Sequence, residues 1–165
     1  MAERRLLALL RALTEAHVDV ILVGGLAAAL DGAPISTFDV DIVHSREPAN
    51  IRRLLGALGK LEASFRIQPE RRMRPEESHL AGSGHLNLNT RHGPLDLLGT
   101  IGRGRGYEAL VPHSAEMDLG DDVRIRVLDL ETVIAVKEEV GGEKDLATLA
   151  VLKRTLREKQ NSGLS

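Results

Sequence analysis

The sequence predicts an α/β (α+β) fold, in which a mixed sheet is flanked by helices and followed by C-terminal helices. Two short β-branched and aliphatic runs, residues 18–23 and 38–43, are typical of buried strands. Leucines recur at helical spacing on either side of these runs, a pattern that indicates amphipathic packing helices. We expect one domain over residues 1–165, with a core over about residues 18–130 and closing helices over about residues 130–158.

The first half of the chain is expected to supply the central strands. Residues 3–16 carry leucines on one helical face and predict a packing helix. A strand over residues 18–23, a short helix over residues 26–30 and a turn over residues 31–34 follow. The second strand run comes next, and Pro48 is placed to begin another amphipathic helix.

The second half predicts two hairpins and two closing helices. The expected elements are a short strand over residues 61–67, an exposed proline- and arginine-rich loop over residues 68–78, a hairpin over residues 85–98, a flexible loop over residues 102–106, a second hairpin over residues 115–128, a helix from Asp129 to a break at Gly141-Gly142, and a last helix that opens at Lys144-Asp145 with Leu146, Leu149, Leu152 and Leu156 on its apolar face. This order completes a layered α/β domain.

Composition narrows the classes of function. With 22 basic and 24 acidic side chains, the chain has no global field that would draw it to nucleic acid or to a membrane. The absence of cysteine excludes disulfides, thiolate catalysis and cysteine-type zinc sites, and it fits a cytoplasmic protein. Two Phe, one Tyr and no Trp leave no stacking platform for single-stranded nucleic acid. Glu3 and Arg11 bracket a short apolar run, so neither a signal peptide nor a membrane span is expected.

Residues 20–43 carry the pattern that suggests a function. Gly24 and Gly25 end one strand and begin a helix, so free N–H groups face the strand mouth and no Cβ keeps a phosphate away. Asp39 and Asp41 alternate with apolar residues, which places both carboxylates on one strand face, with Cα atoms about 6.6 Å apart. Like charges at this spacing repel unless a cation lies between them, and oxygen ligands suit Mg²⁺. Each half alone has a plainer structural interpretation, but together they suggest metal-assisted phosphoryl or nucleotidyl transfer.

This arrangement resembles the signature of the DNA polymerase beta-type nucleotidyltransferase superfamily. That signature is a hydrophobic residue, Gly, and Gly or Ser, followed after about nine to thirteen residues by Asp-hydrophobic-Asp-hydrophobic. Here Val23-Gly24-Gly25 is followed, after thirteen residues, by Asp39-Val40-Asp41-Ile42. The resemblance implies a nucleotidyltransferase-type sheet and a transferase that moves a nucleoside monophosphate from a nucleoside triphosphate to an acceptor hydroxyl on RNA, protein or a small molecule.

The resemblance also implies roles for particular residues. Asp96, an acidic residue inside an otherwise apolar strand, corresponds to the third carboxylate, so that Asp39, Asp41 and Asp96 are the catalytic and metal-binding residues for two Mg²⁺ ions. Gly24, Gly25, Thr37 and Lys137 are then the nucleotide-binding residues, although Thr37 equally suits a plain strand position.

The C-terminal part resembles small bacterial nucleotidyltransferase-like proteins, including those of abortive-infection toxin systems. Lys137 and the Lys144-Asp145 pair match their pattern, whereas Ile35 and Gly142-Glu143 stand where relatives often carry arginines that face phosphate. The alternative is therefore a catalytically inactive protein of the same fold that acts as a toxin–antitoxin or regulatory binding partner.

Other charged residues leave both a functional and a structural interpretation open. Arginines in two loops suit either substrate contacts or solvated surface, whereas the histidines beside the first hairpin are interpreted as ordinary polar positions. These residues are Arg71, Arg72, Arg74, Arg103 and Arg105, and His85 and His92.

Overall fold

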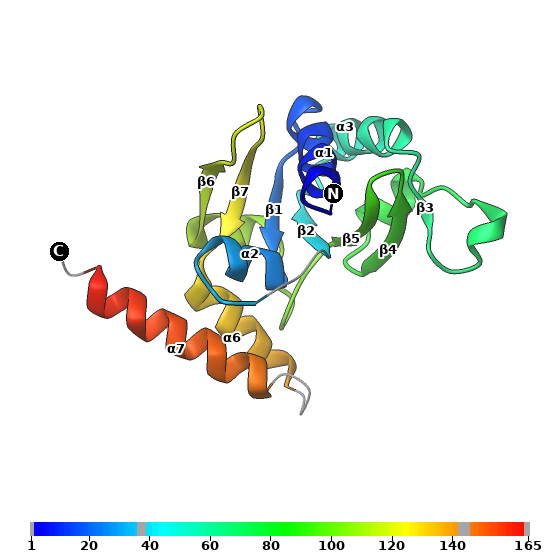
Figure 1. Ribbon diagram of the computed structural model, residues 1–165. Helices are drawn as coiled ribbons and strands as arrows, with labels where there is room; N and C mark the ends of the chain where they lie inside the picture. The colour runs from blue at the N-terminus through cyan, green and yellow to red at the C-terminus, as the bar shows by residue number, and fades with distance from the viewer. Residues whose placement is uncertain (1, 36–38, 142–145, 164–165) are drawn as a thin grey trace.

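Seven strands of the part of the chain that the structure describes join in one mixed sheet (Figure 1). The structure is a computed structural model that describes residues 2–35, 39–141 and 146–163. Its elements are, in chain order, α1 (Ala2–Glu15), β1 (Val20–Val23), α2 (Gly24–Leu30), β2 (Val40–His44), α3 (Pro48–Lys60), β3 (Ser64–Phe65), η1 (Pro69–Arg71), α4 (Glu77–Ala81), β4 (His85–Thr90), β5 (Gly93–Leu98), α5 (Tyr107–Leu110), η2 (Val111–His113), β6 (Ser114–Asp118), β7 (Arg124–Leu128), α6 (Leu130–Val140) and α7 (Leu146–Ser162).

The strand order is β3-β4-β5-β2-β1-β7-β6, so the two strands of the glycine and aspartate motif lie at the centre. β1 runs antiparallel to β2, whereas β1–β7 and β2–β5 are parallel pairs. Every residue of β1 is buried, as expected for a central strand with a continuous aliphatic run. The α/β fold predicted from the sequence is therefore confirmed.

Helices cover the sheet in two groups. Figure 1 shows α1 and α3 together on one side of the view, with α6 and α7 on the other. α1 packs on α3 and contacts β7, while α2 contacts β1, β2 and α6. Leu9, Leu10 and Leu13 of α1 are almost completely buried, which confirms this segment as a packing helix. Among the described residues, no helix has the length and apolar character needed to cross a membrane.

Three local expectations need correction. The loop expected over residues 68–78 ends earlier, because Glu76 and His79 form a capping box that starts α4 and Leu80 anchors this helix in the core. The strand over residues 61–67 shortens to β3, since only two of its residues pair with β4. Leu146 was expected on the apolar face of the last helix but is 64% exposed, because it lies in the first turn of α7, before the buried Leu149.

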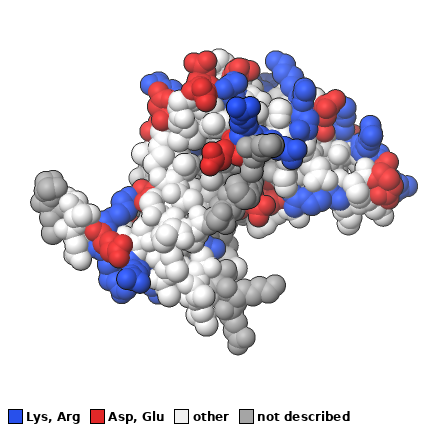
Figure 2. Space-filling model, in the orientation of Figure 1, with Lys and Arg blue, Asp and Glu red and all other residues white. Residues whose placement is uncertain are grey.

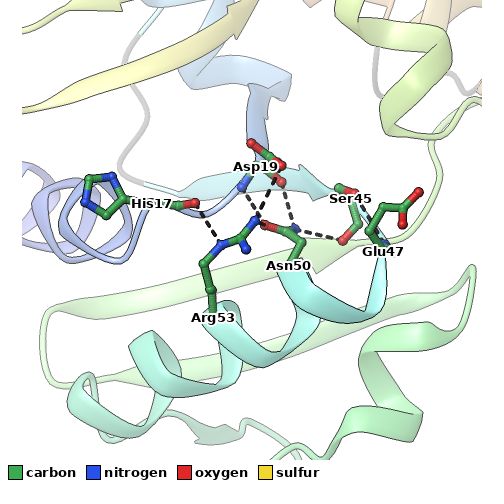
Figure 3. A network of polar contacts seen from close by, with 6 residues as sticks. All are labelled: His17, Asp19, Ser45, Glu47, Asn50 and Arg53. Atoms are coloured by element: carbon green, nitrogen blue, oxygen red, sulfur yellow. Dashed lines mark hydrogen bonds and ion pairs between the residues drawn. The ribbon is translucent and has the colours of Figure 1, made fainter.

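A polar network centred on the buried Asn50 holds one end of the β1–β2 pair against α3 (Figure 3). Asn50 is fully buried; its Oδ1 accepts the N–H of Asp19 at 2.6 Å, and its Nδ2 donates to the carbonyls of Asp19 and Ser45 at 3.1 and 2.8 Å. Arg53 adds a hydrogen bond to the His17 carbonyl at 3.1 Å and a 3.6 Å ion pair with Asp19. Every polar atom of the Asn50 side chain is thus used to hold backbone at this end of the sheet.

Charged side chains of both signs are interspersed over the face shown in Figure 2. This agrees with the near-neutral net charge, and it means that a site for a polyanion depends on local groups rather than on a general field.

Candidate active site

Asp41 and Asp96 lie side by side on neighbouring parallel strands. β2 and β5 pair in a register that puts Asp41 opposite Asp96. Val40, Ile42, Leu95 and Leu97 on the same strands are buried, and the alternation turns the two aspartates toward the other face, where they are half-buried. The structure therefore brings together two of the three carboxylates named from the sequence.

Asp41 carries the largest electrostatic perturbation of the site. Its pKa is raised from 3.8 to about 7, first by burial and then by a hydrogen bond with Asp96 and by the negative charges of Asp96 and Asp39. Lys137 acts in the opposite direction and lowers this pKa. Burial and the two neighbouring carboxylates together raise the pKa of Asp41 by more than the nearby lysine lowers it.

Asp39 precedes β2 and is exposed. Asp39 lies close enough to Asp41 to raise the pKa of Asp41, as Asp96 also does, so the three predicted aspartates interact electrostatically. Within the described residues, no group of three or more His, Asp or Glu side chains has the arrangement of a ready metal site. Thr37, predicted to contact nucleotide, lies outside the described residues.

Gly24 forms the corner beside these carboxylates. Val23, the last residue of β1, pairs with Asp41, and Gly24 then begins α2 with a φ of +69°. A Cβ at Gly24 would come within 2.6 Å of Asp41 Oδ2. Glycine is required here for both its backbone conformation and the close approach of the carboxylate.

Lys137 of α6 lines the same cavity as Gly24 and Asp41. A cavity of about 210 Å³ joins Gly24 and Asp41 to Lys137, and its remaining wall is mostly aliphatic side chains, including Val136 and Val140. Asp129 caps α6 by accepting the Thr132 N–H at 2.7 Å. This end of the helix is also tied to α2 and α7, because Asp31 accepts the Leu130 N–H at 3.1 Å and pairs with Lys159.

The glycine- and arginine-rich loop forms a further wall of this cavity. Ile101 and Arg105 exchange backbone hydrogen bonds of 2.9 and 2.8 Å. Glu139 of α6 accepts the Arg103 N–H at 2.9 Å and pairs with the Arg105 guanidinium, contacts that hold the pKa of Glu139 below its ordinary value. The loop is therefore fastened to α6, and Arg105 is occupied by a structural ion pair.

Two residues at the site were not identified from the sequence. His85, interpreted as an ordinary polar position, lines the cavity with Asp41 and Lys137, whereas His92 lies in a different hollow beside α1. Arg66 contacts Asp96, with its guanidinium nitrogen 3.0 Å from Asp96 Oδ1. A pairing of β3 with β4 is what brings Arg66 there, and no motif in the sequence marks it.

Comparisons with known proteins bear on the fold. No protein-family model matches the sequence, and no curated protein matches it. A solved structure of a protein from Thermotoga maritima, named a "putative nucleotidyltransferase", is similar with a TM-score of 0.58 and 16% identity, over 94% of this chain and 92% of that chain. At this identity the likeness shows the fold alone, and the chain has a nucleotidyltransferase-like fold.

Proposed function

We propose that this chain is a nucleotidyltransferase of the DNA polymerase beta type, which transfers a nucleoside monophosphate from a nucleoside triphosphate to an acceptor hydroxyl of RNA, protein or a small molecule. The observation that carries the proposal is the pairing of Asp41 with Asp96 beside Gly24, in a chain with a nucleotidyltransferase-like fold. The raised pKa of Asp41, which lines the cavity next to its pairing partner Asp96, is typical of a functional site.

The donor set fits Mg²⁺. Asp39, Asp41 and Asp96 offer hard oxygen ligands, and their crowding is relieved when a cation lies among them. Mg²⁺ bound there would polarise the reacting phosphoryl group and acidify the acceptor hydroxyl. Mg²⁺ is usually held by one or two carboxylates together with substrate phosphate oxygens, so a triphosphate is a natural co-ligand.

The other residues bind and orient the substrate. The N–H groups of Gly24 and Gly25, at the corner where α2 begins, would donate to the phosphates of a bound triphosphate. Thr37, named from the sequence as a further nucleotide-binding residue, lies outside the described residues. Lys137 places a positive charge across the cavity from Asp41, where it offsets negative charge on the phosphates. Asp96 is the group that accepts the proton of the acceptor hydroxyl.

The test is transfer of label from each of the four nucleoside triphosphates, with Mg²⁺, to candidate RNA and protein acceptors. Asp39→Asn and Asp41→Asn are expected to lower transfer by roughly a thousandfold or more, because each removes a metal-binding charge. Asp122→Asn is the matched control, since this exposed turn residue has a φ of 62°, which asparagine tolerates. Equal labelling by the wild type and Asp41→Asn would contradict the proposal.

A second candidate is an inactive protein of the same fold that serves as a regulatory or toxin–antitoxin partner. Ile35, half-buried where relatives often carry an arginine, favours it. Calorimetry with ATP separates the two candidates: the enzyme requires Mg²⁺ for binding, whereas a regulator binds equally with or without the metal ion.

A further inference from the structure

Arg66 is fixed over the carboxylate of Asp96 by three neighbouring strands. Phe65 of β3 pairs with Leu88 of β4, and the Arg66 N–H then donates to the Asn87 carbonyl at 2.9 Å. Asn87 is itself paired with Asp96 across β4 and β5. The main chain at Arg66 is thus anchored to β4, the strand that lies between it and Asp96 of β5.

The Arg66 side chain is anchored as well. One guanidinium nitrogen donates both to the Leu88 carbonyl at 2.9 Å and to Asp96 Oδ1 at 3.0 Å. The side chains of Arg66 and Asp96 are 39% and 24% exposed, and Arg66 Nε is buried with no hydrogen-bond partner. An ion pair between partly buried groups, with one partner also bound to the backbone, is more restricted than an exposed pair between two flexible side chains.

We propose that Arg66 supplies at Asp96 the positive charge that a second metal ion supplies in a two-metal site, so that this chain takes a single Mg²⁺ ion, on the side of Asp39 and Asp41. The inference rests on the proposed function and changes the two-ion expectation drawn from the resemblance. An arginine remains protonated at all relevant pH values, so the charge at Asp96 is permanent.

The charge balance supports one ion. Two dications facing three carboxylates leave one surplus positive charge, which suits an incoming polyanion. In this chain Arg66 on Asp96 and Lys137 near Asp41 add two positive charges, so two dications would leave a surplus of three, whereas a single dication leaves a surplus of one. A second dication would have to approach the fixed guanidinium, and the repulsion between them opposes its binding.

The experiment counts bound Mn²⁺ per bound inorganic tripolyphosphate by equilibrium dialysis, a probe that needs no knowledge of the base or the acceptor. The wild type and Arg66→Lys are expected to hold one Mn²⁺ ion, and Arg66→Gln two, because only the glutamine variant leaves Asp96 without a cation. Arg52→Gln is the matched control and should stay at one, since Arg52 is an exposed residue of α3. Circular dichroism checks that each variant is folded.

The outcomes separate this inference from the proposed function. Two ions in the wild type, lost in Asp41→Asn, would overturn the inference and leave the proposed function standing. One ion in folded Arg66→Gln would also overturn it, since Asp96 would then gain nothing from the loss of the arginine. No bound ion in either the wild type or Asp41→Asn would overturn both. If Arg66→Gln does not fold, the counts for the wild type and Arg66→Lys still decide, because the inference requires one ion in each.

Discussion

Polar groups are fully hydrogen-bonded at one end of the β1–β2 pair, whereas carboxylates repel one another at the other end. At the end of Asp19 and Ser45, Asn50 satisfies the backbone with three hydrogen bonds and contributes no charge to a cavity (Figure 3). At the other end, Asp41 is crowded by two like charges, and Gly24 removes the side chain that would otherwise fill the space. The Asn50 end holds the strands in place. At the Asp41 end, repulsion between carboxylates remains, and a positive charge nearby would reduce it.

The largest effect on stability is expected at the Asn50 end of the β1–β2 pair. Asn50→Ala would leave the Asp19 N–H and the buried Ser45 carbonyl without their partners and would open a cavity at the fully buried Asn50 position, whereas the Asp19 carbonyl would keep the Ser45 N–H; the free energy of unfolding should therefore fall by about 3 kcal/mol. Urea denaturation measures the change. Asn161→Ala, at an exposed position near the end of α7, is the control and should change stability by less than about 0.5 kcal/mol. A loss below about 1 kcal/mol at Asn50 would remove the contrast between the two ends.

Gly24→Ala is expected to cost about 2 kcal/mol of unfolding free energy, from strain at positive φ and from the clash of the new Cβ with Asp41 Oδ2. Gly120→Ala has a similar φ of +79° but open space around it, so it measures the conformational cost alone. Thermal melting of both variants gives the difference. Equal losses of unfolding free energy in the two variants would show that the Asp41 side chain moves away from the new Cβ without cost, and would contradict close packing at Gly24.

The smallest effect is a pH dependence that arises at Asp41. With a pKa of about 7 in the folded chain against 3.8 ordinarily, Asp41 keeps a proton that the unfolded chain releases. Its contribution to the free energy of unfolding should therefore fall as pH rises from about 4 to about 7, by about 1 kcal/mol after allowance for solvent screening. Urea denaturation in metal-free buffer, compared between the wild type and Asp41→Asn, isolates this slope. The variant should lack it and be the more stable of the two at pH 8; parallel curves would contradict the assignment.

The local elements of this chain could be predicted from short-range patterns. The helix spacing of the α1 leucines, the β-branched run of β1 and the capping residue Asp129 each act within a few residues, so composition and period identify them. Alternation along β2 likewise puts Asp41 on the face opposite Val40 without reference to the rest of the chain. Where local signals were weak, as at α4 with its single buried Leu80, the prediction was wrong.

Contacts between distant segments were decided only by the tertiary structure. The pairing of Asp41 with Asp96 was anticipated from a family resemblance, but the position of Arg66 depends on the registers of β3, β4 and β5 together. The place of His85 in the cavity and the fastening of Arg105 to Glu139 likewise need segments far apart in the chain to pack against each other. A sequence by itself determines which residues share a strand face or a helix face, because that period is local. Which faces meet, and which charges they bring together, depends on the packing of the whole sheet.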